Sequence, residues 1–210
     1  MSDELGRFNR LKVARLVDFG AYLETQTLGD VLMPSRYLDV NAEVGDEVNA
    51  FIYLDSEDTP IATTEQPYAF VNEFAYLKVV DTSSIGAFLD WGLKKDLLVP
   101  FSEQREKMEV GRRYLVRIFI DKVSDRITAS SKLDKFLDRW PPKYEQGQEV
   151  DLLIANQTDL GYKAIINHNH WGMIYSNEVF RPLSYGSKTK GYVRNCLLYT
   201  SPSPRDLSTS

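Results

Sequence analysis

Three segments of this chain share one pattern of residues, and this repetition limits the folds open to the chain more than any single residue does. The segments are residues 11–23, 75–89 and 151–166. Their central glycines, Gly20, Gly86 and Gly161, are 66 and 75 residues apart. Solenoid repeats are roughly 20–50 residues long, so this longer period predicts small domains in tandem.

The last part of the chain differs from the repeats. Residues 196–206 read Cys-Leu-Leu-Tyr-Thr-Ser-Pro-Ser-Pro-Arg-Asp, which is the translation of a widely used transposase sequencing adapter. We interpret residues 196–210 as adapter read-through rather than native protein, the alternative being a natural Ser/Pro-rich tail. Cys196 is the only cysteine of the chain, so we expect no disulfide and no thiol nucleophile.

The composition is that of a globular protein, with 43% hydrophobic and 26% charged residues among 210. The sequence has no run of about 18 apolar residues, and its N-terminus lacks the basic start and apolar core of a secretory signal. These features predict a cytoplasmic protein without a membrane span. The net charge of −5 argues against nucleic-acid binding through bulk charge, but not against binding on one face.

Short strand-like stretches separated by turn residues fill the repeats. In the first repeat they are residues 11–18, 21–25, 30–34, 47–54 and 60–64. In the second they are residues 75–81, 86–91, 96–100, 113–121 and 126–130. Short helical segments at residues 35–38 and 102–108 follow the third strand of each repeat. This order predicts an all-β fold of tandem five-stranded OB-fold barrels.

The third repeat has three clear strands and the start of a fourth at residues 190–193. No fifth strand precedes the tail, so we expect the third barrel to be incomplete, with an unpaired edge. The helical spacing of Leu133, Phe136 and Leu137 predicts a short connecting helix that ends at Trp140-Pro141-Pro142. The predicted domains are repeat 1 at 1–66, repeat 2 at 67–131, a helical and Pro-containing linker at 132–146, the truncated repeat 3 at 147–195 and the tail at 196–210.

Aromatic side chains beside the central glycines are the best candidates for a binding site. Phe19 and Tyr22 flank Gly20-Ala21, and Phe88 follows Gly86-Ala87. An aromatic ring on the open face of an OB-fold stacks on a base, with roughly 1–3 kcal/mol for each stacked base. We expect the small Gly-Ala pairs to let a base approach the backbone. The alternative is that these rings fill the barrel cores, as strand aromatics usually do.

Cations near the predicted faces are candidates for phosphate contacts, namely Lys12, Arg15 and, in the third repeat, Lys163. The alternative is that they belong to solvated faces without a ligand. His168 and His170 alternate in sequence but have no third ligand, so we expect no metal site. The chain has no Gly-rich phosphate loop and no nucleophile elbow. We therefore expect no cofactor and no enzymatic activity.

The first repeat resembles the RNA-binding repeat of ribosomal protein S1, through Phe-Gly-Ala-Tyr at 19–22, Gly-Asp-Val-Leu-Met-Pro at 29–34 and Ile-Ala-Thr-Thr at 61–64. Across residues 8–195 the chain is similar to the conserved virulence factor B family. The segments that carry this closer resemblance are residues 55–64, 86–93, 129–133 and 158–167. Members of that family have three such repeats followed by a winged-helix domain, bind RNA and influence gene expression. The resemblance therefore implies a C-terminally truncated member.

The S1-type resemblance also implies ligand contacts from an Asp and an Arg late in the repeat, which Asp121 and Arg126 match in the second repeat. Many such repeats carry a histidine at the end of the third strand. Here the corresponding residues are Pro34, Pro100 and Tyr175. The chain thus keeps only part of the pattern.

These features together predict a non-catalytic regulator of gene expression that binds single-stranded RNA through base stacking and phosphate contacts. The alternative is a protein–protein interaction module that uses the same barrels, because OB-folds serve both purposes. Saturable RNA binding that weakens with salt distinguishes the first from the second.

Overall fold

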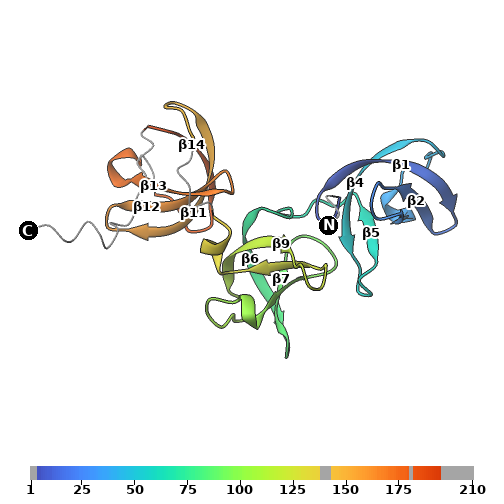
Figure 1. Ribbon diagram of the computed structural model, residues 1–210, viewed down its shortest axis with the longest axis horizontal. Helices are drawn as coiled ribbons and strands as arrows, with labels where there is room; N and C mark the ends of the chain where they lie inside the picture. The colour runs from blue at the N-terminus through green and yellow to red at the C-terminus, as the bar shows by residue number, and fades with distance from the viewer. Residues whose placement is uncertain (1–3, 138–142, 180–181, 195–210) are drawn as a thin grey trace, which may run out of the picture. The chain divides into compact units, whose positions relative to one another are not determined.

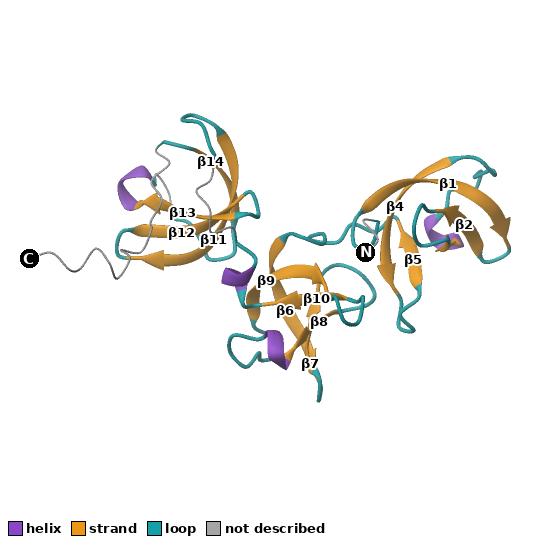
Figure 2. Ribbon diagram, in the orientation of Figure 1, coloured by secondary structure: helices purple, strands orange, loops and turns teal. Residues whose placement is uncertain are grey.

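The computed structural model describes residues 4–137, 143–179 and 182–194. In these ranges the regular secondary structure consists of β-strands and short 3₁₀ helices (Figures 1 and 2). It divides into two compact units, Met1–Leu133 (unit 1) and Asp134–Ser210 (unit 2). Unit 1 holds two closed five-stranded barrels, and unit 2 holds a four-stranded sheet. The predicted all-β fold of tandem barrels with an incomplete third member is confirmed.

The first barrel has the strand order β1-β2-β3-β5-β4 and closes through pairing of β1 with β4. Its elements are β1 Phe8–Val17, β2 Gly20–Glu24, β3 Asp30–Pro34, the 3₁₀ helix η1 Ser35–Tyr37, β4 Glu47–Leu54 and β5 Pro60–Thr63. Apolar side chains at alternate strand positions point inward. The core they form contains Leu11, Val13, Ala21, Leu23, Val31, Met33, Ala50, Ile52 and Ala62.

The second barrel repeats this topology, with the order β10-β8-β7-β6-β9. Its elements are β6 Phe74–Thr82, β7 Gly86–Asp90, β8 Leu97–Pro100, η2 Phe101–Glu103, β9 Arg113–Ile120 and β10 Ile127–Ser130. The helix expected at residues 102–108 is only the single turn η2. The Gln104 side chain ends it, because its Nε2 donates to the Val99 carbonyl and its Oε1 accepts from the Met108 N–H.

Unit 2 contains a sheet of order β13-β12-β11-β14. Its elements are β11 Glu149–Thr158, β12 Gly161–Ile166, β13 His170–Tyr175, η4 Ser176–Glu178 and β14 Lys188–Tyr192. Within the described residues no fifth strand joins β13 to β14, as the sequence predicted. Every residue of β13 remains partly exposed, whereas the equivalent β3 buries two of its side chains.

The predicted connecting helix is a single 3₁₀ turn, η3 Leu133–Lys135, in the described part of the connection. Side-chain hydrogen bonds explain this difference, because the two serines before the turn bond to other groups instead of capping a helix. Ser131 Oγ accepts from the Arg105 N–H, and Ser130 Oγ accepts from the Lys132 N–H. Trp140-Pro141-Pro142 and the predicted read-through at 196–210 lie outside the described residues.

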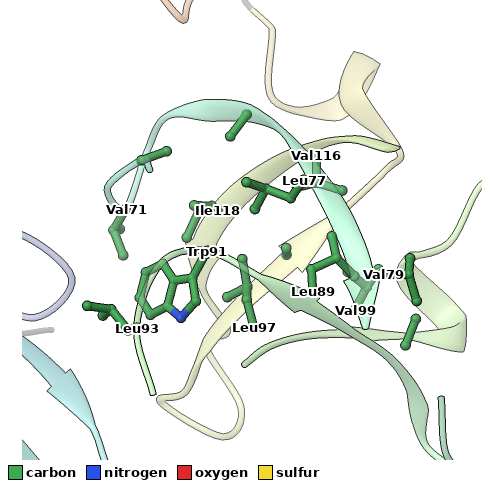
Figure 3. Close-up of a cluster of buried hydrophobic side chains, with 14 of the residues drawn as sticks. Val71, Leu77, Val79, Leu89, Trp91, Leu93, Leu97, Val99, Val116 and Ile118 are labelled. Atoms are coloured by element: carbon green, nitrogen blue, oxygen red, sulfur yellow. The ribbon is translucent and has the colours of Figure 1, made fainter. Parts of the chain in front are cut away.

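Strand β4 joins the two barrels of unit 1, because both of its faces are buried. Ala50 and Ile52 belong to the core of the first barrel, whereas Phe51 and Tyr53 belong to the apolar cluster of the second. The centroid of the Phe51 ring lies 5.8 Å from that of Trp91, in an edge-to-face arrangement. Trp91 in turn lies among Leu93, Leu97 and Ile118 (Figure 3). The two barrels therefore share a core.

An ion-pair network also connects the barrels. Asp58, in the β4–β5 turn, bonds to Lys95 at 3.2 Å and to Arg126, both from the second barrel. Lys95 donates to the Asp55 carbonyl as well. Desolvation raises the pKa of Asp58, but the hydrogen bonds and charges of Lys95 and Arg126 outweigh it, so that the pKa lies below its ordinary value.

We expect Asp58→Asn to destabilise unit 1 at neutral pH, because it removes the carboxylate of both ion pairs. The loss should be about 1 kcal/mol, since these pairs are partly exposed to solvent. A depressed folded-state pKa stabilises the protein above the unfolded-state pKa, and this contribution is lost as pH falls through the folded value. The difference between wild type and variant should therefore disappear in acid. Urea unfolding from pH 7 to pH 2 measures it. Glu57→Gln, which removes an exposed carboxylate from the same turn, is the control, and equal stability of Asp58→Asn and wild type at pH 7 contradicts the prediction.

Candidate nucleic-acid interface

The central glycines belong to the barrel walls rather than to a ligand site. Gly20 has φ of 153°, and a Cβ on it would lie 2.1 Å from the Met33 carbonyl oxygen of β3. Gly86 and Gly161 have the same geometry. Ala21 and Ala87 are fully buried. The expectation that Gly-Ala lets a base approach the backbone is therefore wrong, because glycine is needed here for the close approach of two strands.

A row of outward-facing side chains crosses the first barrel. Arg15 on β1 lies opposite Tyr22 on β2, and Tyr22 lies opposite Leu32 on β3. A β-bulge between Val13 and Arg15 shifts the register and produces the first of these pairs. The Arg15 guanidinium carbon lies 3.9 Å from the centroid of the Tyr22 ring. This arrangement is a cation–π pair whose planar cation covers one face of the ring.

Phe19 lies in the turn between β1 and β2, between the two strand-like stretches that the sequence predicted. Its side chain is 57% exposed, which excludes the alternative that this ring fills the core. Its carbonyl accepts from the N–H of Ser35, the first residue of η1. The turn and η1 therefore meet beside the ends of β2 and β3. The ring is available to a ligand on the outside of the barrel.

Two further cations of the first barrel, Lys12 and Arg36, lie near this row by strand and turn position. Lys12 is exposed on β1 and lies opposite Glu24 and Glu47, so acidic neighbours offset its charge. Arg36 in η1 is also exposed, with its guanidinium carbon 4.5 Å from the Tyr37 ring centroid. Sequence reasoning missed Arg36. Its position in Pro-Ser-Arg-Tyr, directly after β3, is the signal that would have found it.

The second barrel has an equivalent row with a different charge. Asp81 on β6 lies opposite Phe88, and Phe88 lies opposite Leu98. Phe88 is half-buried on β7. The Asp81 carboxylate accepts from the Thr82 N–H at 2.8 Å. Asp81 therefore occupies the place that Arg15 holds in the first barrel.

Exposed apolar and acidic side chains surround this second row. Ile85 is 55% exposed and Phe101 is 51% exposed, and the Phe101 N–H donates to the Ile85 carbonyl. Sequence reasoning missed Phe101, although it follows the end of β8 as Ser35 follows β3. Desolvation and the charges of Asp90 and Asp81 raise the pKa of Asp96, which places three carboxylates within electrostatic reach of one another.

Asp121 and Arg126, the predicted ligand contacts of the second repeat, have structural partners. The Asp121 carboxylate accepts from the N–H of Ser124 at 3.0 Å and from its hydroxyl at 2.7 Å, which holds the β9–β10 turn. Arg126 pairs with Asp58 of the first barrel. The structure thus gives both residues a role in folding, whether or not they also contact a ligand.

Lys163 takes the position of Tyr22 in unit 2. It lies on β12 between Asn156 and Met173, with its Nζ 3.9 Å from the Trp171 ring centroid. The Trp171 Nε1–H donates to Asp134 at 3.0 Å. The third repeat therefore presents a lysine on the face of a tryptophan ring, and the position equivalent to Tyr22 is not aromatic.

The described residues contain no group of three or more side chains suited to hold a metal ion. His170 has its Nδ1 3.1 Å from the Tyr144 hydroxyl. None of the helices in the described part of the chain has the length and hydropathy of a membrane span.

Residues 5–65 match the family model of the S1 domain. The chain is 34% identical over 90 residues to the uncharacterized protein YitL of Bacillus subtilis, covering 42% of this chain and 30% of that protein. It is 27% identical over 84 residues to conserved virulence factor B of Staphylococcus saprophyticus, covering 38% of this chain and 28% of that protein. The matched region is thus less than a third of the length of either relative.

A solved structure has a similar fold. It is a multidomain protein with nucleic acid binding domains from Streptococcus pneumoniae, with a TM-score of 0.54 and 20% identity over 92% of this chain and 70% of that one. At this level of identity the likeness concerns the fold.

Proposed function

We propose that this chain, whose residues 5–65 match the S1 domain and which is similar to conserved virulence factor B over 84 residues, binds single-stranded RNA through the outer face of its first barrel and thereby regulates gene expression. The observation that carries the proposal is the Arg15 guanidinium on the Tyr22 ring, 3.9 Å from its centroid, on the outer face of the barrel. Unstacked bases pack on aromatic rings and on guanidinium planes. The nucleic acid binding domains of the similar streptococcal protein support the same class of ligand.

The contact should be local, because the chain as a whole is acidic, with a net charge of −5. Lys12, Arg15 and Arg36 are the cations of the first barrel nearest to the proposed face by strand and turn position. Three phosphate contacts on a single strand give a slope of about −2 for log K against log salt. We therefore propose stacking as the main contribution and phosphate contacts as a smaller one.

The test replaces the two aromatic residues of this face. We expect Phe19→Ala/Tyr22→Ala to weaken binding of labelled single-stranded RNA about tenfold or more, because each stacked base contributes roughly 1–3 kcal/mol. Fluorescence anisotropy with the full chain, across a salt series, measures the affinity and its salt dependence. Single-stranded DNA of the same sequence is run in parallel, because only RNA carries the 2′-hydroxyl.

Tyr68→Ala is the matched control, since Tyr68 is an aromatic residue of unit 1 that is 58% exposed and lies between β5 and β6, outside the row. It should leave the affinity unchanged. RNA binding that is insensitive to Phe19→Ala/Tyr22→Ala would place the site elsewhere.

A second candidate is a protein–protein interaction module. The observation that favours it is the exposed apolar pair Ile85 and Phe101 beside Asp81, a surface that suits a protein better than a phosphate backbone. Absence of RNA binding by the wild type even at low salt would favour this second candidate.

A further inference from the structure

We propose that one cross-strand pair decides which barrel of unit 1 accepts RNA. Arg15 opposite Tyr22 makes the face of the first barrel competent, and Asp81 opposite Phe88 closes the face of the second barrel to nucleic acid. This inference rests on the proposed function and adds the residue that selects the barrel.

The two pairs are equivalent in the fold. Each follows a β-bulge in the first strand of its barrel, between Val13 and Arg15 and between Val79 and Asp81. In each barrel the aromatic partner stands two residues after the wall glycine and lies opposite a leucine of the next strand. A side chain placed at either position therefore points to the same side of the same kind of sheet.

The other charged pair between the first two strands has matching charges in the two barrels, whereas on the opposite edge of the first strand Lys12 faces Glu47 and Lys78 faces Arg113. Lys12 lies opposite Glu24 in the first barrel, and Lys78 lies opposite Asp90 in the second. The acidic residue that begins β3, Asp30, has its counterpart in Asp96, directly before β8. Among the paired residues of the first two strands, Arg15 and Asp81 therefore account for the difference in charge.

The exchange of charge changes what the aromatic ring offers to a ligand. Arg15 lies on its ring and extends the stacking surface with a planar cation. Asp81 lies opposite Phe88 in the strand pairing, and its carboxylate accepts from the Thr82 N–H. A phosphate that approaches Phe88 meets this negative charge. At about 6 Å in water, reversal of one charge beside a phosphate changes affinity about tenfold.

The experiment exchanges the two residues in the full chain. The variants are Arg15→Asp, Asp81→Arg and the double exchange, which has the net charge of the wild type. The probe is a fluorescein-labelled oligouridine of about ten nucleotides, within the site size of one OB-fold. Anisotropy titrations with the probe concentration below the dissociation constant give the affinity, and titrations with the probe concentration above it give the stoichiometry.

We expect one RNA for each wild-type chain, about tenfold weaker binding by Arg15→Asp, and two RNAs for each Asp81→Arg chain. The double exchange should also bind one RNA, but through the second barrel. Phe88→Ala added to the double exchange should therefore lower its affinity for RNA, and Tyr22→Ala added to it should not. Glu106→Arg makes the same charge change at another exposed position of the second barrel, and should not create a second site. Arg15 and Asp81 are exposed, so circular dichroism melts should match the wild type.

Two results overturn the inference and leave the proposed function intact. One is an Asp81→Arg variant that still binds one RNA. The other is that Phe88→Ala, introduced into the wild-type chain, lowers the affinity for RNA as much as Tyr22→Ala does. A wild type that binds no RNA contradicts both. The number of RNAs bound by the Asp81→Arg variant thus distinguishes failure of this inference from failure of the proposed RNA binding.

Discussion

Phe51→Ala is expected to destabilise unit 1 by about 3–5 kcal/mol, the range for removal of a buried phenylalanine. Phe51 is fully buried and packs against Phe8, Phe70 and Trp91, with ring centroids 5.4, 5.8 and 5.8 Å away. It lies on a strand of the first barrel but belongs to the apolar cluster of the second. The cavity left by its removal therefore weakens the contact between the two barrels.

Urea unfolding followed by circular dichroism measures this effect. In the wild type we expect the two barrels to unfold together, because they share a core, and in Phe51→Ala we expect a lower midpoint and a broader transition. Phe101→Ala removes the same atoms from a side chain that is 51% exposed, and should cost less than about 0.5 kcal/mol. Equal midpoints for the two variants would contradict the shared core.

Gly20→Ala should destabilise the first barrel by about 3 kcal/mol. The new Cβ would lie 2.1 Å from the Met33 carbonyl oxygen, and φ of 153° is unfavourable for a residue with a side chain. Overpacking and backbone strain each cost roughly 1–3 kcal/mol. Neither strand can move away without breaking the β2–β3 ladder of the barrel wall.

Gly29→Ala separates the two contributions. Gly29 has φ of 73°, but no atom lies within 4 Å of a Cβ placed there, so only the backbone strain of about 1 kcal/mol applies. Thermal unfolding of both variants gives the comparison. A Gly20→Ala variant no less stable than Gly29→Ala would show that the strands can separate.

The repeat spacing and the alternation of apolar residues predicted the fold because strand formation and inward-facing positions depend on neighbouring residues. The sequence also placed Tyr22 and Phe88 on strands and Arg15 near the predicted face. The pairing register makes Arg15 and Tyr22 direct neighbours. It did not predict the two-sided burial of β4. The continuous apolar run from Ala50 to Leu54 is the signal for it, since a strand that alternates has one solvated face.

The role of the wall glycines was assigned wrongly for a related reason. A glycine beside an aromatic residue suits both a ligand platform and a close crossing of strands, and only the position of the Met33 carbonyl distinguishes them. The prediction of a connecting helix was wrong because Ser130 and Ser131 bond to groups of the second barrel instead of capping a helix. These groups are the Glu103 carbonyl and the Arg105 N–H. Such partners lie far away in sequence.

By itself, the sequence determined the all-β architecture, the number of repeats and the aromatic residues offered on the strands, because these follow from local periodicity and residue type. Only the tertiary structure decided what the charged residues do. Arg126 pairs with Asp58, 68 residues away, and Asp81 takes the place of Arg15 through a bulge and a strand register. The physical reason is that charge acts through distance in space, and closure of the barrels determines which charges meet.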